Sequence, residues 1–239
     1  MASFVGNQES SGVEIPGSGI VKGATSTKAM PSQLNLGLPS SETAELLKRG
    51  IHVRTERQQI LFGEGERVDR LFVVESGSFK RVRQSRDGRE LILSLVGAGD
   101  LFGAIAAPIV ATNQVQALQD SICFSIPVAA VQRAIEHHPP FAVRLLGLMH
   151  ARQREAELTA ARFALETVPQ RLAHLILTES DPRSGELRFP LNQTEIANVI
   201  GSSRETVCSI LNRLRRDEIL ALSRGRIRIL DRQRLADIV

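Results

Sequence analysis

The chain has 239 residues, of which 42% are hydrophobic and 23% are charged. These proportions are close to those of soluble globular domains, and they exclude collagen-like, fibrous and wholly disordered proteins. No apolar run approaches the roughly 20 residues that a membrane-spanning helix needs, and the N-terminus lacks the basic-then-apolar order of a signal peptide. We therefore expect a cytoplasmic protein of two unequal domains, with no membrane partner.

Cysteine and histidine are sparse. Two cysteines, Cys123 and Cys208, exclude a disulfide framework and a zinc or iron–sulfur site built mainly on thiolates. The five histidines show neither His-x-His nor His-Glu-x-x-His, the spacings of common catalytic metal sites. The sequence therefore predicts no metal site and no cofactor.

The net charge of +4 is concentrated near the C-terminus. From Arg188 onward there are ten arginines and six acidic residues, a surplus that equals that of the whole chain. Such a basic segment is typical of proteins that bind the phosphate backbone of nucleic acids. Solvated helix faces in an arginine-biased sequence would give the same count, so charge alone leaves both interpretations open.

The first 36 residues are rich in Gly, Ser, Thr and Pro and carry few large apolar side chains. Burial in such a segment cannot offset the entropy lost on ordering, so we predict a disordered tail over residues 1–36. Ser40, Ser41 and Glu42, followed by Leu46 and Leu47, predict a short helix with a serine N-cap.

Residues 51–126 alternate between short β-like runs and turns. The runs recur at roughly 8 to 12 residues with Gly and Asp between them, which indicates an antiparallel sandwich or barrel. Asp87-Gly88 between two apolar runs predicts a hairpin. The clearest runs are Ile60–Phe62, Leu71–Val74, Phe79–Val82 and Leu91–Val96.

A helical period begins after Pro139-Pro140 and continues for more than twenty residues. One stripe of this helix has the spacing of a coiled-coil seam. The stripe could belong to the core of its own domain, but the charged flanks Arg152, Arg154, Glu155 and Glu157 favour a half-exposed helix that pairs with a second copy. The predicted dimer contacts are Leu146, Met149, Gln153, Ala156, Ala160 and Phe163.

Residues 192–214 have the pattern of a helix-turn-helix. Ile196, Val199 and Ile200 give one apolar face, and Gly201 supplies the tight turn. A second helix follows, with Val207, Ile210, Leu211 and Leu214 on its inner face. Arg204, Glu205, Cys208 and Ser209 remain on the outer face near its N-terminus, where side chains reach base edges in a major groove. The alternating segment Ser223–Ile229, with Gly225 at its turn, predicts the hairpin of a winged helix.

The motif Gly201-Ser-Ser-Arg-Glu-Thr-Val207 closely resembles that of the CRP/FNR family of bacterial transcription regulators, and the resemblance covers about residues 37–239. Phe62-Gly-Glu-Gly-Glu66, Val74-Glu-Ser-Gly77 and Gly99-Asp-Leu-Phe-Gly103 agree with the β-roll of that family. The resemblance implies an α+β fold with an antiparallel β-roll sensor domain (37–138), a dimerisation helix (139–166) and a winged helix-turn-helix (167–239). It also implies a homodimer that binds near-palindromic double-stranded DNA and acts with RNA polymerase.

The resemblance assigns roles within the helix-turn-helix. Arg204 and Glu205 read bases, and Cys208 and Ser209 lie beside them. Family members usually carry an arginine where this chain has Ser209, so one guanine contact is missing and we expect a different operator. The implied phosphate contacts are Asn192, Gln193, Thr194, Ser203 and Thr206.

The effector site departs from that of the cyclic-nucleotide binders in the family. Those proteins carry a glutamate for the ribose, an Arg-Ser pair for the cyclic phosphate, and Thr and Ser on the central helix. This chain has Ala104, Ala111-Thr112 and Ala156-Glu157 at those places. We therefore predict a regulator independent of cyclic AMP, and the cysteine cluster of the iron–sulfur members is also absent.

The sequence leaves alternatives open for how the protein is regulated and for its functional class. Cys208, near a helix N-terminus and Arg204, is a candidate redox site because both features favour a thiolate. Another effector in the β-roll, such as a different nucleotide, a metabolite or haem bound through His150 or His137-His138, is the second hypothesis. A cupin-like enzyme is a remote third, because it needs a metal constellation and residues 51–126 contain only His52.

Overall fold

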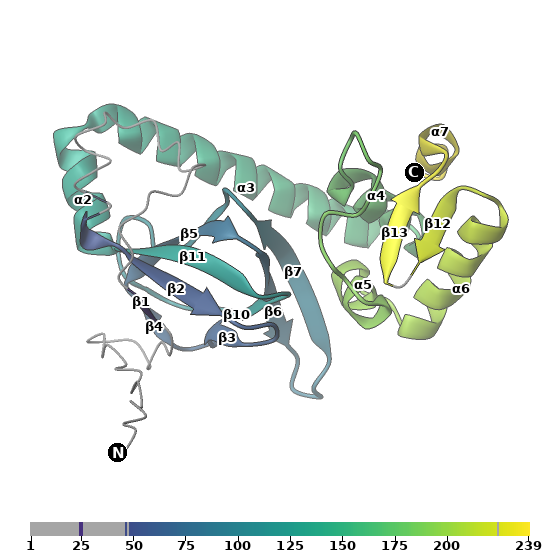
Figure 1. Ribbon diagram of the computed structural model, residues 1–239, viewed down its shortest axis with the longest axis horizontal. Coiled ribbons are helices and arrows are strands. Elements are labelled where there is room, and N and C mark those ends of the chain that lie inside the picture. The colour runs from purple at the N-terminus through teal and green to yellow at the C-terminus, as the bar shows by residue number, and fades with distance from the viewer. Residues whose placement is uncertain (1–23, 26–45, 47, 224) are drawn as a thin grey trace, which may run out of the picture.

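The computed structural model describes residues 24–25, 46, 48–223 and 225–239. A β-domain lies at one end of the molecule, a long helix runs along it, and a smaller, mainly helical domain lies at the other end (Figure 1). The predicted fold class is confirmed: an antiparallel β-roll, a long helix and a C-terminal winged helix-turn-helix.

The β-roll is built from two main antiparallel sheets. One sheet has the order β1 (Ala24–Thr25), β2 (Ile51–Thr55), β11 (Ser121–Pro127), β5 (Arg70–Ser76), β8 (Leu101–Gly103). The other has the order β3 (Ile60–Phe62), β10 (Gln114–Ala117), β6 (Ser78–Gln84), β7 (Glu90–Gly97). A short pair is formed by β4 (Arg67–Val68) and β9 (Ile109–Val110).

The four predicted runs fall within β3, β5, β6 and β7, and the hairpin predicted at Asp87-Gly88 joins β6 to β7. Gly88 has a φ of 81°, a conformation that glycine adopts without steric cost. Inside the roll, the rings of Phe72 and Phe102 stack with centroids 5.2 Å apart, and Phe62 and Phe79 pack against Phe102. The interior of the roll is therefore largely apolar.

Two residues of the segment predicted to be a disordered tail differ from that prediction. Ala24 and Thr25 form β1, which pairs with Val53 and His52 of β2. Strand addition at a sheet edge uses backbone hydrogen bonds and needs no large apolar side chains, so composition did not indicate it. The serine N-cap predicted at residues 40–41 lies outside the described residues, while Leu46, Lys48 and Arg49 are helical.

The roll leads into α2 (Val128–His137), which the sequence analysis did not predict, and then into α3 (Pro139–Leu165). Helix α3 starts with two prolines, which are tolerated there because the first helical N–H groups have no intrahelical acceptor. Of its 27 residues only Phe141 and Leu145 are fully buried. A long helix that buries so little of its surface leaves one face available to a partner.

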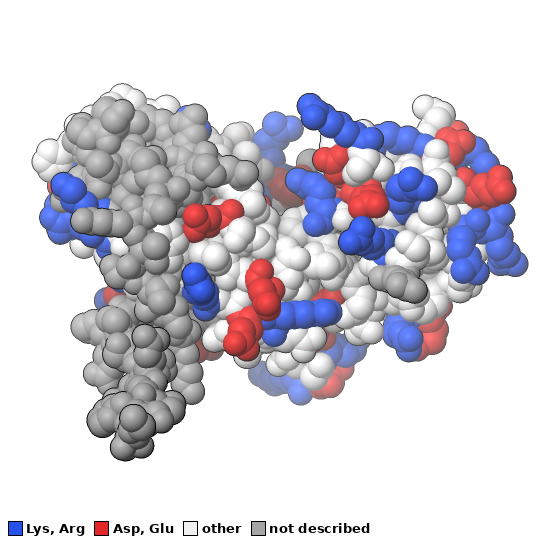
Figure 2. Space-filling view, in the orientation of Figure 1, with Lys and Arg blue, Asp and Glu red and all other residues white. Residues whose placement is uncertain are grey.

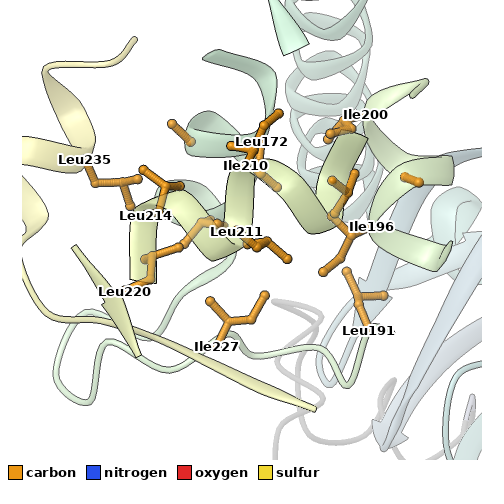
Figure 3. Close-up of a cluster of buried hydrophobic side chains, with 14 of the residues drawn as sticks. Leu172, Leu191, Ile196, Ile200, Ile210, Leu211, Leu214, Leu220, Ile227 and Leu235 are labelled. Carbon is orange, nitrogen blue, oxygen red and sulfur yellow. The ribbon is translucent and has the colours of Figure 1, made fainter. Parts of the chain in front are cut away.

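The C-terminal domain packs α4 (Val168–Glu179), α5 (Gln193–Ile200), α6 (Arg204–Arg216), the hairpin β12 (Leu220–Ser223) and β13 (Arg226–Ile229), and α7 (Arg232–Ala236) around one core. Figure 3 shows this core, in which leucine and isoleucine side chains from each of these elements converge. Leu118 of the β-roll belongs to the same buried cluster, and Leu95 packs against it. The two domains therefore share apolar contacts.

Candidate DNA-binding site

The turn between α5 and α6 has the geometry of a helix-turn-helix. Gly201 has a φ of 62°, and a Cβ at this position would lie 2.6 Å from Cε1 of Phe163. Both the left-handed backbone and the close approach of α3 therefore require glycine. Phe163 was predicted as a dimer contact, but it is half-buried within its own chain, packed on this turn and under the guanidinium of Arg171.

Helix α6 divides into an inner and an outer face as predicted. Val207, Ile210, Leu211 and Leu214 are buried in the core of the domain. On the other side, Arg204, Glu205 and Ser209 are exposed to solvent. These three side chains lie near the N-terminal end of α6, the part of a recognition helix that contacts base edges.

Cys208 differs from those three neighbours. It is half-buried, and its thiol donates a hydrogen bond to Oε1 of Gln193, with sulfur and oxygen 2.8 Å apart. The sequence analysis placed Cys208 on the outer face with Arg204 and Glu205. The structure instead places its sulfur at the contact between α6 and the first residue of α5, because residue 208 lies between the inner and outer faces of the helix.

Several of the predicted phosphate contacts have capping roles. Oδ1 of Asn192 accepts the N–H of Glu195, and the Glu195 side chain accepts the N–H of Asn192 in return. Oγ of Ser203 accepts the N–H of Thr206 and lies 2.9 Å from Oγ1 of Thr206. Asn192, Thr194, Ser203 and Thr206 are nevertheless exposed. They surround two helix N-termini, where backbone dipoles favour anions.

An open groove of about 640 Å³ runs between the start of α5, the outer face of α6 and the wing. Its lining combines predicted contacts with residues that the sequence analysis did not single out: Asn192, Gln193, Thr194, Arg204, Asn212, Arg215, Ser223 and Arg226. The arginine surplus pointed to this region, but only the fold shows which arginines share the groove with Arg204.

The wing contributes positive charge beside this groove. Strands β12 and β13 pair from Leu220–Ile229 to Ser223–Arg226, and the side chain of Arg226 is 76% exposed. Figure 2 shows many arginine side chains over the lobe that contains α6, the wing and α7, with acidic side chains among them. This distribution suits a surface that meets a phosphate backbone.

Two of the β-roll positions that correspond to cyclic-nucleotide contacts are apolar and buried, while a third, Thr112, is exposed. Ala104 and Ala111 are 0% and 4% exposed and belong to the core of the roll. Nearby, Nε of Arg81 donates to Oδ1 of Asn113 at 3.2 Å, and Arg152 of α3 donates to the carbonyl oxygen of Leu101. Partial burial lowers the pKa of both guanidinium groups.

The other predicted dimer contacts lie on the outer side of α3. Leu146 is 68% exposed, and Gln153, Ala156 and Ala160 are also exposed, while Met149 is half-buried. Val143, 69% exposed, lies one turn before Leu146. An exposed stripe of this kind is compatible with a seam between two copies.

Among the described residues, no helix combines the length and the apolar character of a membrane span. The same residues contain no cluster of three or more His, Cys, Asp or Glu side chains that could hold a metal ion.

Comparison with known proteins agrees with this geometry. Residues 52–138 match the model of the cyclic nucleotide-binding domain, and residues 170–238 match that of the Crp-like helix-turn-helix domain. The "CRP-like cAMP-activated global transcriptional regulator" of Mycobacterium tuberculosis is 31% identical over 208 residues, which cover 84% of this chain and 93% of that protein. The "Cyclic AMP receptor protein" of Thermus thermophilus is 27% identical over 180 residues, covering 74% and 83%.

Among solved structures, FixK2 from Bradyrhizobium japonicum superposes with a TM-score of 0.74 at 23% identity, covering 79% of this chain and 96% of that one. This likeness concerns the fold. Together with the sequence relatives and the two matched domains, it identifies the chain as a member of the CRP/FNR family of transcriptional regulators.

Proposed function

We propose that this chain is a homodimeric transcription regulator that reads a near-palindromic operator with the start of α6 and acts without cyclic AMP. The observation that carries the proposal is the exposed set Arg204, Glu205 and Ser209 at the N-terminal end of a helix whose opposite face is fixed in the core. RNA polymerase is the expected partner at the promoter, as for other transcription regulators.

Base reading is assigned to Arg204 and Glu205. An arginine can donate two hydrogen bonds to O6 and N7 of guanine, and a glutamate can accept from the amino group of cytosine. The exposed groups Asn192, Thr194, Ser203 and Thr206 are assigned to phosphates, which fix the register of the protein without reading sequence. Arg215 and Arg226, in the same groove, extend the phosphate contacts.

Dimerisation is assigned to the outer stripe of α3. A C2 dimer would place the same residues of two helices against one another. The small side chains Ala156 and Ala160 would allow a close approach, and Val143 and Leu146 would bury apolar surface.

Independence from cyclic AMP is supported by the two buried alanines of the roll. Ala104 and Ala111 offer a ribose and a cyclic phosphate neither charge nor a side-chain hydrogen bond. Leaving a buried charged group without its partner costs roughly 2–5 kcal/mol or more. The M. tuberculosis and T. thermophilus relatives are named for cyclic AMP, so independence from the nucleotide would set this chain apart from them.

A second candidate is control by another small ligand in the roll, and Arg81 and Arg152 favour it. Burial lowers the pKa of both guanidinium groups, and for Arg152 the charge of Asp100 raises the pKa while the charge of Arg81 lowers it. A small anion between them would relieve both costs, so an acidic metabolite is the ligand chemistry that this arrangement would accept.

Redox control is assigned to Cys208. Oxidation would convert the thiol that donates to Gln193 into a sulfenic or sulfinic acid next to the DNA-facing groove. The product would alter the contact between α5 and α6, and sulfinic acid would add a negative charge near DNA phosphates.

Replacing Arg204 with alanine tests base reading. We expect specific binding to fall by about 1 to 3 kcal/mol with relaxed preference at one base pair, because one bidentate contact is lost. Affinities for a selected operator and for random DNA are compared by fluorescence anisotropy. Thr194→Ala is the matched control, and it should lower the affinity for both duplexes alike. An equal loss of affinity for both duplexes in Arg204→Ala would contradict base reading by Arg204.

Replacing Ala156 with glutamate tests the dimer. Both copies would bring a carboxylate to the seam, so sedimentation velocity should show a shift toward monomer. Ala151→Glu is the control, since residue 151 is exposed and lies five residues away, about 140° around the helix from Ala156. A dimer that persists unchanged in Ala156→Glu would place the interface elsewhere.

Isothermal titration calorimetry tests independence from cyclic AMP. The nucleotide should give no binding heat at micromolar concentrations, should not raise the melting temperature, and should not tighten operator binding. The M. tuberculosis relative serves as the positive control. Saturable micromolar binding by this chain would contradict the prediction.

Peroxide treatment tests Cys208. Hydrogen peroxide converts the thiol to sulfenic acid with release of water, and operator affinity should fall and then recover with a thiol reductant. Cys208→Ala should bind DNA yet ignore peroxide. Cys123→Ala should stay sensitive, because Cys123 is 0% exposed and burial raises the pKa of its thiol to about 12. Identical responses of the wild type and Cys208→Ala to peroxide would contradict redox control at Cys208.

A further inference from the structure

A buried ion pair joins the β-roll to the DNA-binding domain. Nζ of Lys80 on β6 lies 3.1 Å from Oε1 of Glu195 on α5, and the two side chains are only 7% and 8% exposed. Oε2 of Glu195 accepts the N–H of Asn192, so both carboxylate oxygens are used. The two residues are 115 positions apart, and nothing in their local sequence indicates the contact.

The contacts around this pair are mostly apolar. Helix α5 packs on β7, Leu118 and Leu95 of the roll join the core of the DNA-binding domain, and the Phe189 ring lies over Gly97. Apolar contacts hold two surfaces together without fixing one orientation, because the hydrophobic effect is non-directional. A buried charge pair does fix the orientation, because sliding the surfaces would leave one or both charges without a partner.

The orientation that the pair fixes leaves the recognition face accessible. Arg204, Glu205 and Ser209 are exposed while Lys80 and Glu195 are joined. Glu195 also closes the cap of α5, and α5 carries the turn that leads into α6. A movement of Lys80 would therefore be transmitted to the start of the recognition helix through a single short helix.

We propose that Lys80 is a positioning residue for DNA binding: by pairing with Glu195 it fixes the angle of the helix-turn-helix on the β-roll and thereby the spacing of the two recognition helices in the dimer. The proposal rests on the dimeric DNA-reading function proposed above. Binding of the second half-site is then an intramolecular event, favoured only if both recognition helices reach their grooves together.

Strand β6 also links this pair to the interior of the roll. Arg81, the residue after Lys80, lies on the other face of the strand and bonds to Asn113 near the roll's core. Consecutive residues of one strand thus contact the DNA-binding domain and the sensor interior. A change at Arg81 would reach Glu195 without passing through α3.

The test compares operators of different spacing. Duplexes selected from a random pool by the wild-type protein are lengthened between half-sites by about 5 base pairs, roughly half a helical turn, which turns the second half-site to the opposite face. The measured quantity is the ratio of affinities for the native and lengthened duplexes. Lys80→Met and Glu195→Gln should each reduce this ratio by about tenfold or more, since the advantage of linked half-sites is lost.

The variants separate positioning from folding. Glu195→Gln removes the charge but can keep the cap of α5, because glutamine serves the same capping role. Lys80→Arg keeps the charge and should restore most of the spacing ratio, and Arg83→Met, which removes an exposed charge from the same strand, should leave it unchanged. The double variant Lys80→Met/Glu195→Gln should be no worse than either single one, because a shared interaction is lost only once.

The outcomes are distinct. A folded Lys80→Met or Glu195→Gln protein that keeps the wild-type spacing ratio overturns the positioning role, and Glu195→Gln alone decides if Lys80→Met does not fold. A wild-type protein that binds both duplexes equally overturns the dimeric reading proposed above, and the positioning role with it. Reduced ratios in both single variants, restored by Lys80→Arg, support it.

Discussion

The DNA-binding face depends on α5 being held from two sides. An isolated helix of eight residues is not stable in water, so its position comes from packing. Ile196, Ala197 and Ile200 face the core of the C-terminal domain, while Glu195 is joined to Lys80 of the β-roll. Because α6 follows α5 after a three-residue turn, the orientation of the recognition helix is set by the same contacts.

The features predicted from the residues themselves, apart from the family resemblance, are local. The inner face of α6, the turn at Gly201 and the hairpin at Asp87-Gly88 are each determined within a few residues, by helical period or by the φ angle that a turn requires. The features that the sequence did not predict depend on residues distant in the chain: Phe163 packs on Gly201, Cys208 bonds to Gln193, and Lys80 pairs with Glu195. Residue type does not indicate these contacts, because a phenylalanine at the spacing of a seam can pack on a second copy or on its own chain.

The roll keeps the fold of the cyclic nucleotide-binding domain with alanines at two positions where the cyclic-nucleotide binders of the family carry polar side chains. Ala104 and Ala111 are buried beside a cluster of phenylalanine rings, so the interior is stabilised by apolar packing. Two arginines remain near it, Arg81 from the strand side and Arg152 from α3, both partly removed from water. The small anion proposed above as a ligand would suit these two arginines, whereas the two alanines provide a ribose with no side-chain hydrogen bond.

Two of the contacts that connect the helix-turn-helix to the rest of the chain lie at opposite ends of α5, and together they constrain it more than either could alone. Phe163 at the end of α3 packs on Gly201, a contact near the pivot of the domain, which by itself would permit rotation about α3. Lys80 holds the other end of α5, since Glu195 lies in its first turn and Gly201 follows its last residue. Fixing both ends of α5 removes that rotation. A signal that reaches either β6 or α3 can therefore change the angle of α6 while leaving the core of the DNA-binding domain intact.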